Sequence, residues 1–145
     1  MGLAVASGRV GYAMLSDHDL IDWDVSRVAC RSYEHANMKA MEWIDLLAPE
    51  VVVTERIGSN PRKRGKTLAL MAAVHEAVKQ SNAISVTTAK VRVHTDKYAE
   101  ARALADAYPE LELRLARKPA CWKTEPRRMI LFEALALALR VKETE

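Results

Sequence analysis

The sequence predicts an α/β fold, a five-stranded mixed sheet with helices on both faces. Three short segments with the alternation or apolar content of β-strands come first along the chain. Two further β-branched segments then alternate with stretches of helical periodicity, which is the arrangement of a right-handed parallel crossover unit. The length of 145 residues suits one sizeable core, so we expect a single domain over residues 1–145.

The first three strands are predicted at residues 2–6, 10–15 and 20–29, with Ser7 and Gly8 as the turn between the first two. The third strand alternates apolar and acidic residues, so its two faces should differ. One face carries Ile21, Trp23 and Val25, and the other carries Asp22 and Asp24.

Helices and strands alternate through the middle of the chain. Apolar residues recur at helical spacing over residues 31–47, and Pro49 closes that segment. The segments EVVVT (50–54) and AISVTT (83–88) are short and β-branched, which is typical of strands buried on both faces. Residues 67–80, between them, have the apolar stripe of a crossover helix.

Two more helices complete the predicted fold. The first is capped by Thr95 or Asp96 and runs to about Ala107. The second starts near Pro126, a residue favoured in the first turn of a helix, and runs to about Val141.

Composition excludes several classes of protein. Half of the residues are apolar and 28% are charged, which is ordinary for a soluble globular protein. No signal peptide and no apolar run of about 18 residues is present, so we expect a cytoplasmic protein without a membrane partner. The net charge of +3 is too small to indicate a nucleic-acid partner by itself. Walker loops, dinucleotide fingerprints and nucleophile elbows are absent from the sequence.

Two acids, Glu55 and Glu133, stand where a site could form. Glu55 ends the VVVT strand, and ligands of open α/β sheets gather beyond the carboxyl ends of strands. Glu133 is the one acid in the apolar segment ILFEALALAL, where an ionised carboxylate is costly unless it is paired or bound to a metal. Each acid also has a plainer interpretation, Glu55 as a solvated residue that opens a loop and Glu133 as a side chain that reaches solvent through a gap.

If the two acids converge, the chemistry that suits them is Mg²⁺ or Mn²⁺ binding. Hard divalent ions prefer carboxylate oxygens and keep several waters. Paired ions can clamp the attacking and leaving oxygens of a phosphodiester. Two carboxylates are too few for a tight two-metal site.

Basic residues gather in two segments near these acids. The cations of the first segment are Arg56, Arg62, Lys63, Arg64 and Lys66, with no acid among them. The cations of the second are Arg114, Arg117, Lys118, Lys123, Arg127 and Arg128. Each segment fits a contact with a phosphate backbone, and each also fits a solvated basic loop.

In their order, several segments resemble the RuvC-type, Holliday-junction-resolvase-like branch of the ribonuclease-H-like superfamily. SGRVGYAML and LIDWDV are similar to its first hairpin and third strand, and PEVVVTE to its second acidic strand. HTDKYAEARALADAYPEL and WKTEPRRMILFEALALAL are similar to its later helix and its acidic C-terminal helix. The resemblance spans nearly the whole chain and implies a ribonuclease-H-like fold.

The resemblance also implies a function. It implies Mg²⁺-dependent cleavage of DNA, often at branched junctions, by a carboxylate cluster, and it implies a homodimer. Glu55 matches the acid after the central strand, Glu133 an acid on the last helix, and Glu125 an acid near the start of that helix. Glu125 and Glu133 are eight residues apart, about 12 Å of helix rise, so they are not expected to bind one ion together.

The chain departs from this family at its first acidic motif. Where the family has an aspartate on the first strand, this sequence reads LAVAS, so Ala4, or with less support Ala6, takes that place and offers no ligand. A second acid of the last helix is also missing, because Met129 or Ile130 stands there. Asp22 and Asp24 on the third strand are the nearest candidates to substitute.

Three functions therefore compete. The first is a metal-dependent endodeoxyribonuclease with Glu55 and Glu133 as catalytic ligands. The second is a nucleic-acid-binding protein that kept the fold and basic surface but lost catalysis at Ala4. The third is an interaction module whose partner is a protein.

Overall fold

The structure is a computed structural model that describes residues 1–6, 8–17, 19–57, 65–89, 97–114 and 129–144. Its strands are β1 (Gly2–Ala6), β2 (Arg9–Ser16), β3 (Asp19–Ser26), β4 (Val51–Glu55) and β5 (Ile84–Thr88). Its α-helices are α1 (Tyr33–Leu47), α2 (Lys66–Gln80), α3 (Lys97–Ala107) and α4 (Met129–Thr144). Two short 3-10 helices are η1 (Val28–Cys30) and η2 (Pro109–Arg114).

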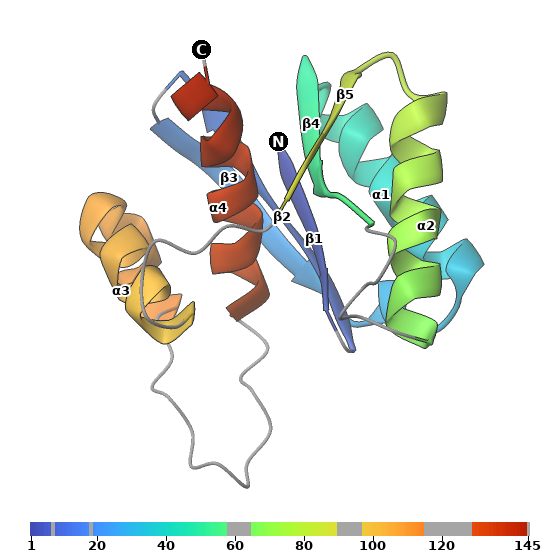
Figure 1. The fold of residues 1–145 in the computed structure, drawn as a ribbon, viewed down its shortest axis with the longest axis horizontal. Coiled ribbons are helices and arrows are strands. Elements are labelled where there is room, and N and C mark those ends of the chain that lie inside the picture. Colours follow the sequence, from blue (N-terminus) through green and yellow to red (C-terminus); the bar gives the residue numbers. More distant parts are fainter. Residues whose placement is uncertain (7, 18, 58–64, 90–96, 115–128, 145) are drawn as a thin grey trace, which may run out of the picture.

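The strands form one mixed sheet in the order β3-β2-β1-β4-β5. The pairs β1–β2 and β2–β3 are antiparallel, whereas β1–β4 and β4–β5 are parallel. Helices α1 and α2 lie on one side of the sheet, and α3 and α4 lie on the other (Figure 1). The predicted α/β fold, a five-stranded mixed sheet with helices on both faces, is confirmed.

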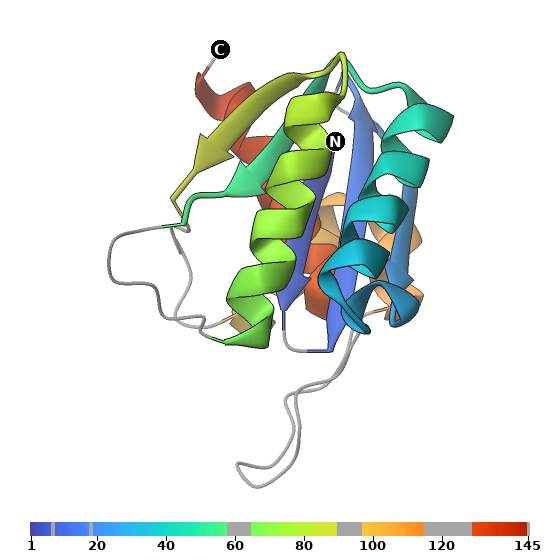
Figure 2. The same ribbon diagram turned by 90° about the vertical axis from the view of Figure 1, so that its right-hand side faces the viewer.

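Each face of the sheet has its own core. Trp43 of α1 and Leu70 of α2 are buried on the face that Figure 2 turns toward the viewer. Phe132 and Leu135 of α4 are buried on the other face, together with Leu111 of η2. Helix α4 is apolar nearly all round because it lies between the sheet and α3.

Two glycines allow α4 to lie directly on the strands. A Cβ atom at Gly2 would lie 1.9 Å from the carbonyl oxygen of Ala134, and one at Gly11 would lie 2.9 Å from Cγ2 of Ile130. Because Gly2 has no side chain, the backbone of α4 approaches β1 more closely than any other residue type permits, and Gly11 leaves room on β2 for the side chain of Ile130. This close approach sets how near the middle of α4 lies to β1.

Two strand predictions are wrong. The segment AISVTT was expected to be buried on both faces, but β5 is an edge strand, and Ile84 is 63% exposed. The third strand was expected to reach residue 29, but it ends at Ser26. The hydroxyl of Ser26 accepts a hydrogen bond from the backbone N–H of Ala29 at 3.2 Å, and the chain turns there into η1.

The predicted N-terminal residues of the last two helices, Thr95 or Asp96 and Pro126, lie outside the described residues. No helix in the described part of the chain combines the length and apolar character needed to cross a membrane.

Candidate carboxylate site

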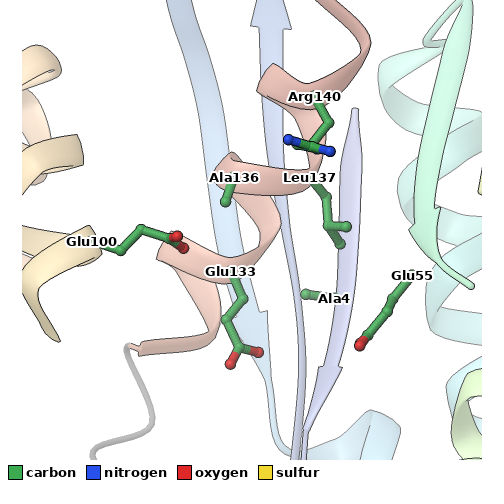
Figure 3. Close-up of a pocket in the computed structure, with 7 residues that line it drawn as sticks. All are labelled: Ala4, Glu55, Glu100, Glu133, Ala136, Leu137 and Arg140. Atoms are coloured by element: carbon green, nitrogen blue, oxygen red, sulfur yellow. The ribbon is translucent and has the colours of Figure 1, made fainter. Parts of the chain in front are cut away.

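Side chains from β1, β4, α3 and α4 line a small pocket on the α4 side of the sheet (Figure 3). The lining residues are Ala4, Glu55, Glu100, Glu133, Ala136, Leu137 and Arg140. The cavity volume is about 30 Å³, which is room for roughly two water molecules. The structure thus brings together the two acids, Glu55 and Glu133, that the sequence singled out.

Glu55 is held at the end of β4. It is the last residue of the strand and pairs with Thr88 of β5 in the parallel ladder. Its backbone carbonyl also accepts a hydrogen bond from Nε2 of His75 on α2, at 3.0 Å. Burial lowers the pKa of His75 below its ordinary value, and the bond to the Glu55 carbonyl partly offsets this effect. The carboxylate therefore projects from a backbone that is fixed on two sides.

Ala4 occupies the floor between the two acids. Its side chain is 4% exposed and belongs to the core beneath α4. In Figure 3 the methyl group of Ala4 lies between the Glu55 side chain on one side and Glu133 on the other. A carboxylate at this position of β1 would point into the same pocket.

Glu133 projects from α4 beside the sheet. It is partly buried, whereas its neighbours Phe132 and Ala134 are fully buried. Glu133 forms part of the pocket wall together with Glu55.

Two pocket residues were missed at the level of sequence. Glu100 belongs to α3, and Arg140 lies on α4 two turns after Glu133. Both look like ordinary surface charges of amphipathic helices. The available signal for Arg140 was its spacing of seven residues from Glu133, which places both on one helix face.

Solved structures of two resolvases match nearly the whole of this chain. Thermus thermophilus RuvC matches 97% of this chain with 95% of its own, at 15% identity and a TM-score of 0.60. The same protein in complex with a Holliday junction substrate matches 95% of this chain with 88% of its own, at 17% identity and a TM-score of 0.59. The chain has the ribonuclease-H-like fold of the RuvC-type resolvases.

A viral resolvase has the same RuvC-type fold. The fowlpox virus resolvase in complex with substrate Holliday junction DNA matches 99% of this chain with 98% of its own, at 13% identity and a TM-score of 0.62. No family model matches the sequence, and no curated protein matches it. Likenesses at such low identity establish the fold, so function must be argued from the site.

In this RuvC-type fold, Asp22 and Asp24 cannot substitute for a ligand at Ala4. Tyr12 pairs with Asp24 in the antiparallel ladder, and its hydroxyl donates a hydrogen bond to Oδ2 of Asp22 at 2.9 Å. Tyr12 is buried in the core under α1 and α2, whereas Ala4 is buried under α4. Both aspartates therefore lie on the face of the sheet opposite the pocket.

The other positions that the family pattern singles out do not line the pocket within the described residues. Met129 and Ile130, where a second acid of the last helix was sought, begin α4, and both are fully buried in the core between α4 and the sheet. Ala4 lines the pocket and Ala6 does not, and the match of Ala4 to a missing aspartate stays a prediction. Glu125 lies outside the described residues.

The donor set fits one hard divalent ion but not a two-ion cluster. Glu55 and Glu133 offer carboxylate oxygens from two elements, and Mg²⁺ is commonly bound by one or two carboxylates completed by water and substrate phosphate. Among the residues that the structure describes, no group of three or more acidic, histidine or cysteine side chains is arranged to hold a metal ion. Ala4, between the two acids, offers no ligand to such an ion.

Only part of the predicted basic surface falls within the described residues. Arg56 directly follows Glu55 and is exposed, and Lys66 is exposed at the first turn of α2. Arg62, Lys63, Arg64, Lys123, Arg127 and Arg128 lie outside the described residues. A cationic rim beside Glu55 therefore stays a prediction.

Proposed function

We propose that this chain binds branched DNA and hydrolyses its phosphodiester backbone at the pocket formed by Glu55 and Glu133. The observation that carries the proposal is that these two acids, from β4 and α4, line one pocket on either side of Ala4. Carboxylates at this edge of an α/β sheet stand beyond the strand ends, where ligands of such sheets bind. The solved structures of this fold include two complexes with Holliday junctions, which supports a branched DNA as the substrate.

Glu55 and Glu133 would hold one Mg²⁺ or Mn²⁺ ion. When bound, the ion supplies Lewis-acid stabilisation of negative charge on the phosphoryl oxygens. The chain itself supplies position, because His75 and the β4 ladder fix the backbone of Glu55. Leu137, which is 8% exposed, and Ala4 limit the water around the carboxylates.

Ala4 lowers the activity of this site. A third carboxylate from β1 would raise both the charge and the number of ligands around the ion, and ligand count sets the affinity of oxygen-ligated ions. We therefore expect the unaltered chain to need millimolar Mn²⁺ or Mg²⁺ and a bound substrate phosphate to complete the coordination.

Cleavage of a labelled four-way junction tests this function. The unaltered chain should cut the junction slowly with Mn²⁺, and both Glu55→Gln and Glu133→Gln should abolish cutting while junction binding persists. The matched control is Glu50→Gln, because Glu50 is exposed and precedes the opposite end of β4. Equal cutting by Glu55→Gln and the unaltered chain would overturn the proposed site.

A second candidate function is DNA binding without catalysis, and Ala4 is the observation that favours it. The Ala4→Asp variant separates the two. If the pocket is a hydrolytic site weakened by Ala4, the unaltered chain cuts at a low rate and Ala4→Asp cuts faster at the same position. If catalysis is lost, only Ala4→Asp cuts, and the unaltered chain binds junctions without cutting at any metal concentration.

The basic segment after Glu55 is proposed to contact the DNA backbone. Replacing Arg62, Lys63 and Arg64 together with Ala should weaken junction binding and make it less sensitive to salt, because each lost phosphate contact removes released counterions. Binding that does not respond to salt would instead favour a protein partner.

We also propose that the active unit is a homodimer. Resolving a four-way junction requires two cuts on strands related by the two-fold symmetry of the junction, and a two-fold dimer presents two equivalent pockets. Light scattering of the chain with and without a junction tests this expectation. A strictly monomeric complex with the junction would contradict it.

A further inference from the structure

One face of α4 carries opposite charges at its two ends within the pocket. Glu133, Ala136, Leu137 and Arg140 follow the i, i+3, i+4, i+7 pattern, so they form one stripe along the helix. Seven residues of helix rise separate Glu133 from Arg140 by roughly 10 Å along the axis. In Figure 3 the Glu133 carboxylate lies at one end of the pocket and the Arg140 guanidinium at the other.

The parts of α4 and β1 between these charges are apolar, and Glu100 of α3 also lines the pocket. Ala136 and Leu137 of α4 and Ala4 of β1 lie between the two ends of the stripe. Charges beside apolar walls interact more strongly than charges in bulk water. A ligand that fits this stripe must therefore present an electropositive or metal-bound group at one end and an anion at the other.

A nucleic-acid strand satisfies both conditions. Its phosphates recur along a chain, so one phosphate can share the ion at Glu55 and Glu133 while a neighbouring phosphate extends toward Arg140. The guanidinium is planar, is charged at every working pH, and binds phosphate oxygens in bidentate fashion. Arg140 is partly buried and lines the pocket, so its guanidinium is within reach of a strand that lies along this stripe.

We propose that Arg140 is a positioning residue that binds a backbone phosphate neighbouring the one to be cleaved. This inference rests on the proposed function and adds the direction in which the strand crosses the pocket, from Glu133 toward Arg140 along α4. The guanidinium fixes the register of the strand, and the carboxylates act on the phosphate that this register presents. Its charge also disfavours a second metal ion at that end, in agreement with a one-ion site.

Junction binding in EDTA tests the role of Arg140 apart from any cleavage. The affinity of the unaltered chain, Arg140→Gln and Arg140→Lys for a labelled four-way junction is measured between about 50 and 200 mM salt. The matched control is Lys79→Gln, which removes an exposed cation from the last turn of α2 on the opposite face of the sheet. Circular dichroism melts confirm that each variant is folded.

Arg140→Gln should lower the affinity about tenfold, because it removes a charge-assisted hydrogen bond. It should also reduce the slope of log K against log salt by about 0.7 to 0.9, the contribution of one phosphate contact. Arg140→Lys should restore the slope and part of the affinity, since it keeps the charge but loses the bidentate fork. Lys79→Gln should match the unaltered chain in both quantities.

Cleavage kinetics provide the second measurement. In the cutting-competent Ala4→Asp background, Arg140→Gln should raise KM and shift the position of the cut along the strand, which a merely structural role would not do. If the chain binds junctions but Arg140→Gln leaves slope, affinity and cut position unchanged, the inference on Arg140 is overturned and the proposed function stands. If no variant binds a junction, the proposed function is overturned and the role of Arg140 with it.

Discussion

Replacement of Gly2 by Ala should uncouple α4 from the sheet and damage the site. The added Cβ would lie 1.9 Å from the backbone oxygen of Ala134 and 2.9 Å from the backbone nitrogen of Ala138. Real Cβ atoms essentially never approach another heavy atom within 3.0 Å, so α4 must withdraw by about 1.1 Å at this point. The obstacle is helix backbone, which cannot change rotamer to make room.

The magnitude follows from what α4 buries. Phe132, Ile130 and Leu135 are at most 2% exposed, so withdrawal of the helix opens the whole core on that face. We expect a loss of about 3 kcal/mol in the free energy of unfolding, at the upper end of overpacking costs. For a domain of this size, the midpoint of thermal unfolding should fall by about 12 °C.

Gly11→Ala is the matched comparison. Its Cβ would meet Cγ2 of Ile130 at 2.9 Å, and a side chain can rotate away, so the expected cost is about 1 kcal/mol. Calorimetry and urea unfolding measure both variants. A midpoint for Gly2→Ala within about 2 °C of the unaltered chain, or no lower than that of Gly11→Ala, would refute the close-packing argument.

Three further changes have definite expected results. Because burial lowers the pKa of His75, the folded chain binds fewer protons than the unfolded chain when the pH falls below 6.5. The contribution of His75 to the free energy of unfolding should therefore be constant above pH 6.5 and decrease below it. His75→Gln should lose this part of the pH dependence in chemical-denaturation curves recorded from pH 5 to 8. Tyr12→Phe removes the hydrogen bond to Asp22 and should cost about 1 kcal/mol in urea unfolding, with junction affinity unchanged because the bond lies on the face opposite the pocket. Phe132→Ala should cost about 3 to 5 kcal/mol, whereas Leu46→Ala, at a side chain that is 75% exposed on α1, should cost under about 0.5 kcal/mol.

Most of the fold is readable from the sequence because periodicity reports burial. The apolar stripe of residues 67–80 predicts α2 to within one residue at its start, and the continuous run VVVT predicts β4. Strand order is not readable in this way, since it depends on contacts between distant segments. AISVTT has the composition of a central strand, yet β5 lies at the edge of the sheet and leaves Ile84 exposed.

The pocket residues also fall into two groups, those that the sequence indicates and those that depend on contacts between distant segments. Glu133 is conspicuous because a lone acid in an apolar helix requires an explanation, and Glu55 because it ends a buried strand. Glu100 and Arg140 are common residue types on amphipathic helices, so their approach to the pocket depends on how α3 and α4 dock. The role of Gly2 was also hidden, because the sequence does not show which backbone atom lies above it.

Titration of Mn²⁺ into the unaltered chain, Ala4→Asp and the double variant Ala4→Asp/Glu55→Gln tests the central claim most directly. If Glu55 and Glu133 flank a site that lacks one carboxylate, Ala4→Asp should bind Mn²⁺ about tenfold more tightly or better. Its thermal midpoint should rise with Mn²⁺ more than that of the unaltered chain, and the double variant should lose both gains. Equal Mn²⁺ affinity in all three proteins would contradict a shared ion site at this pocket.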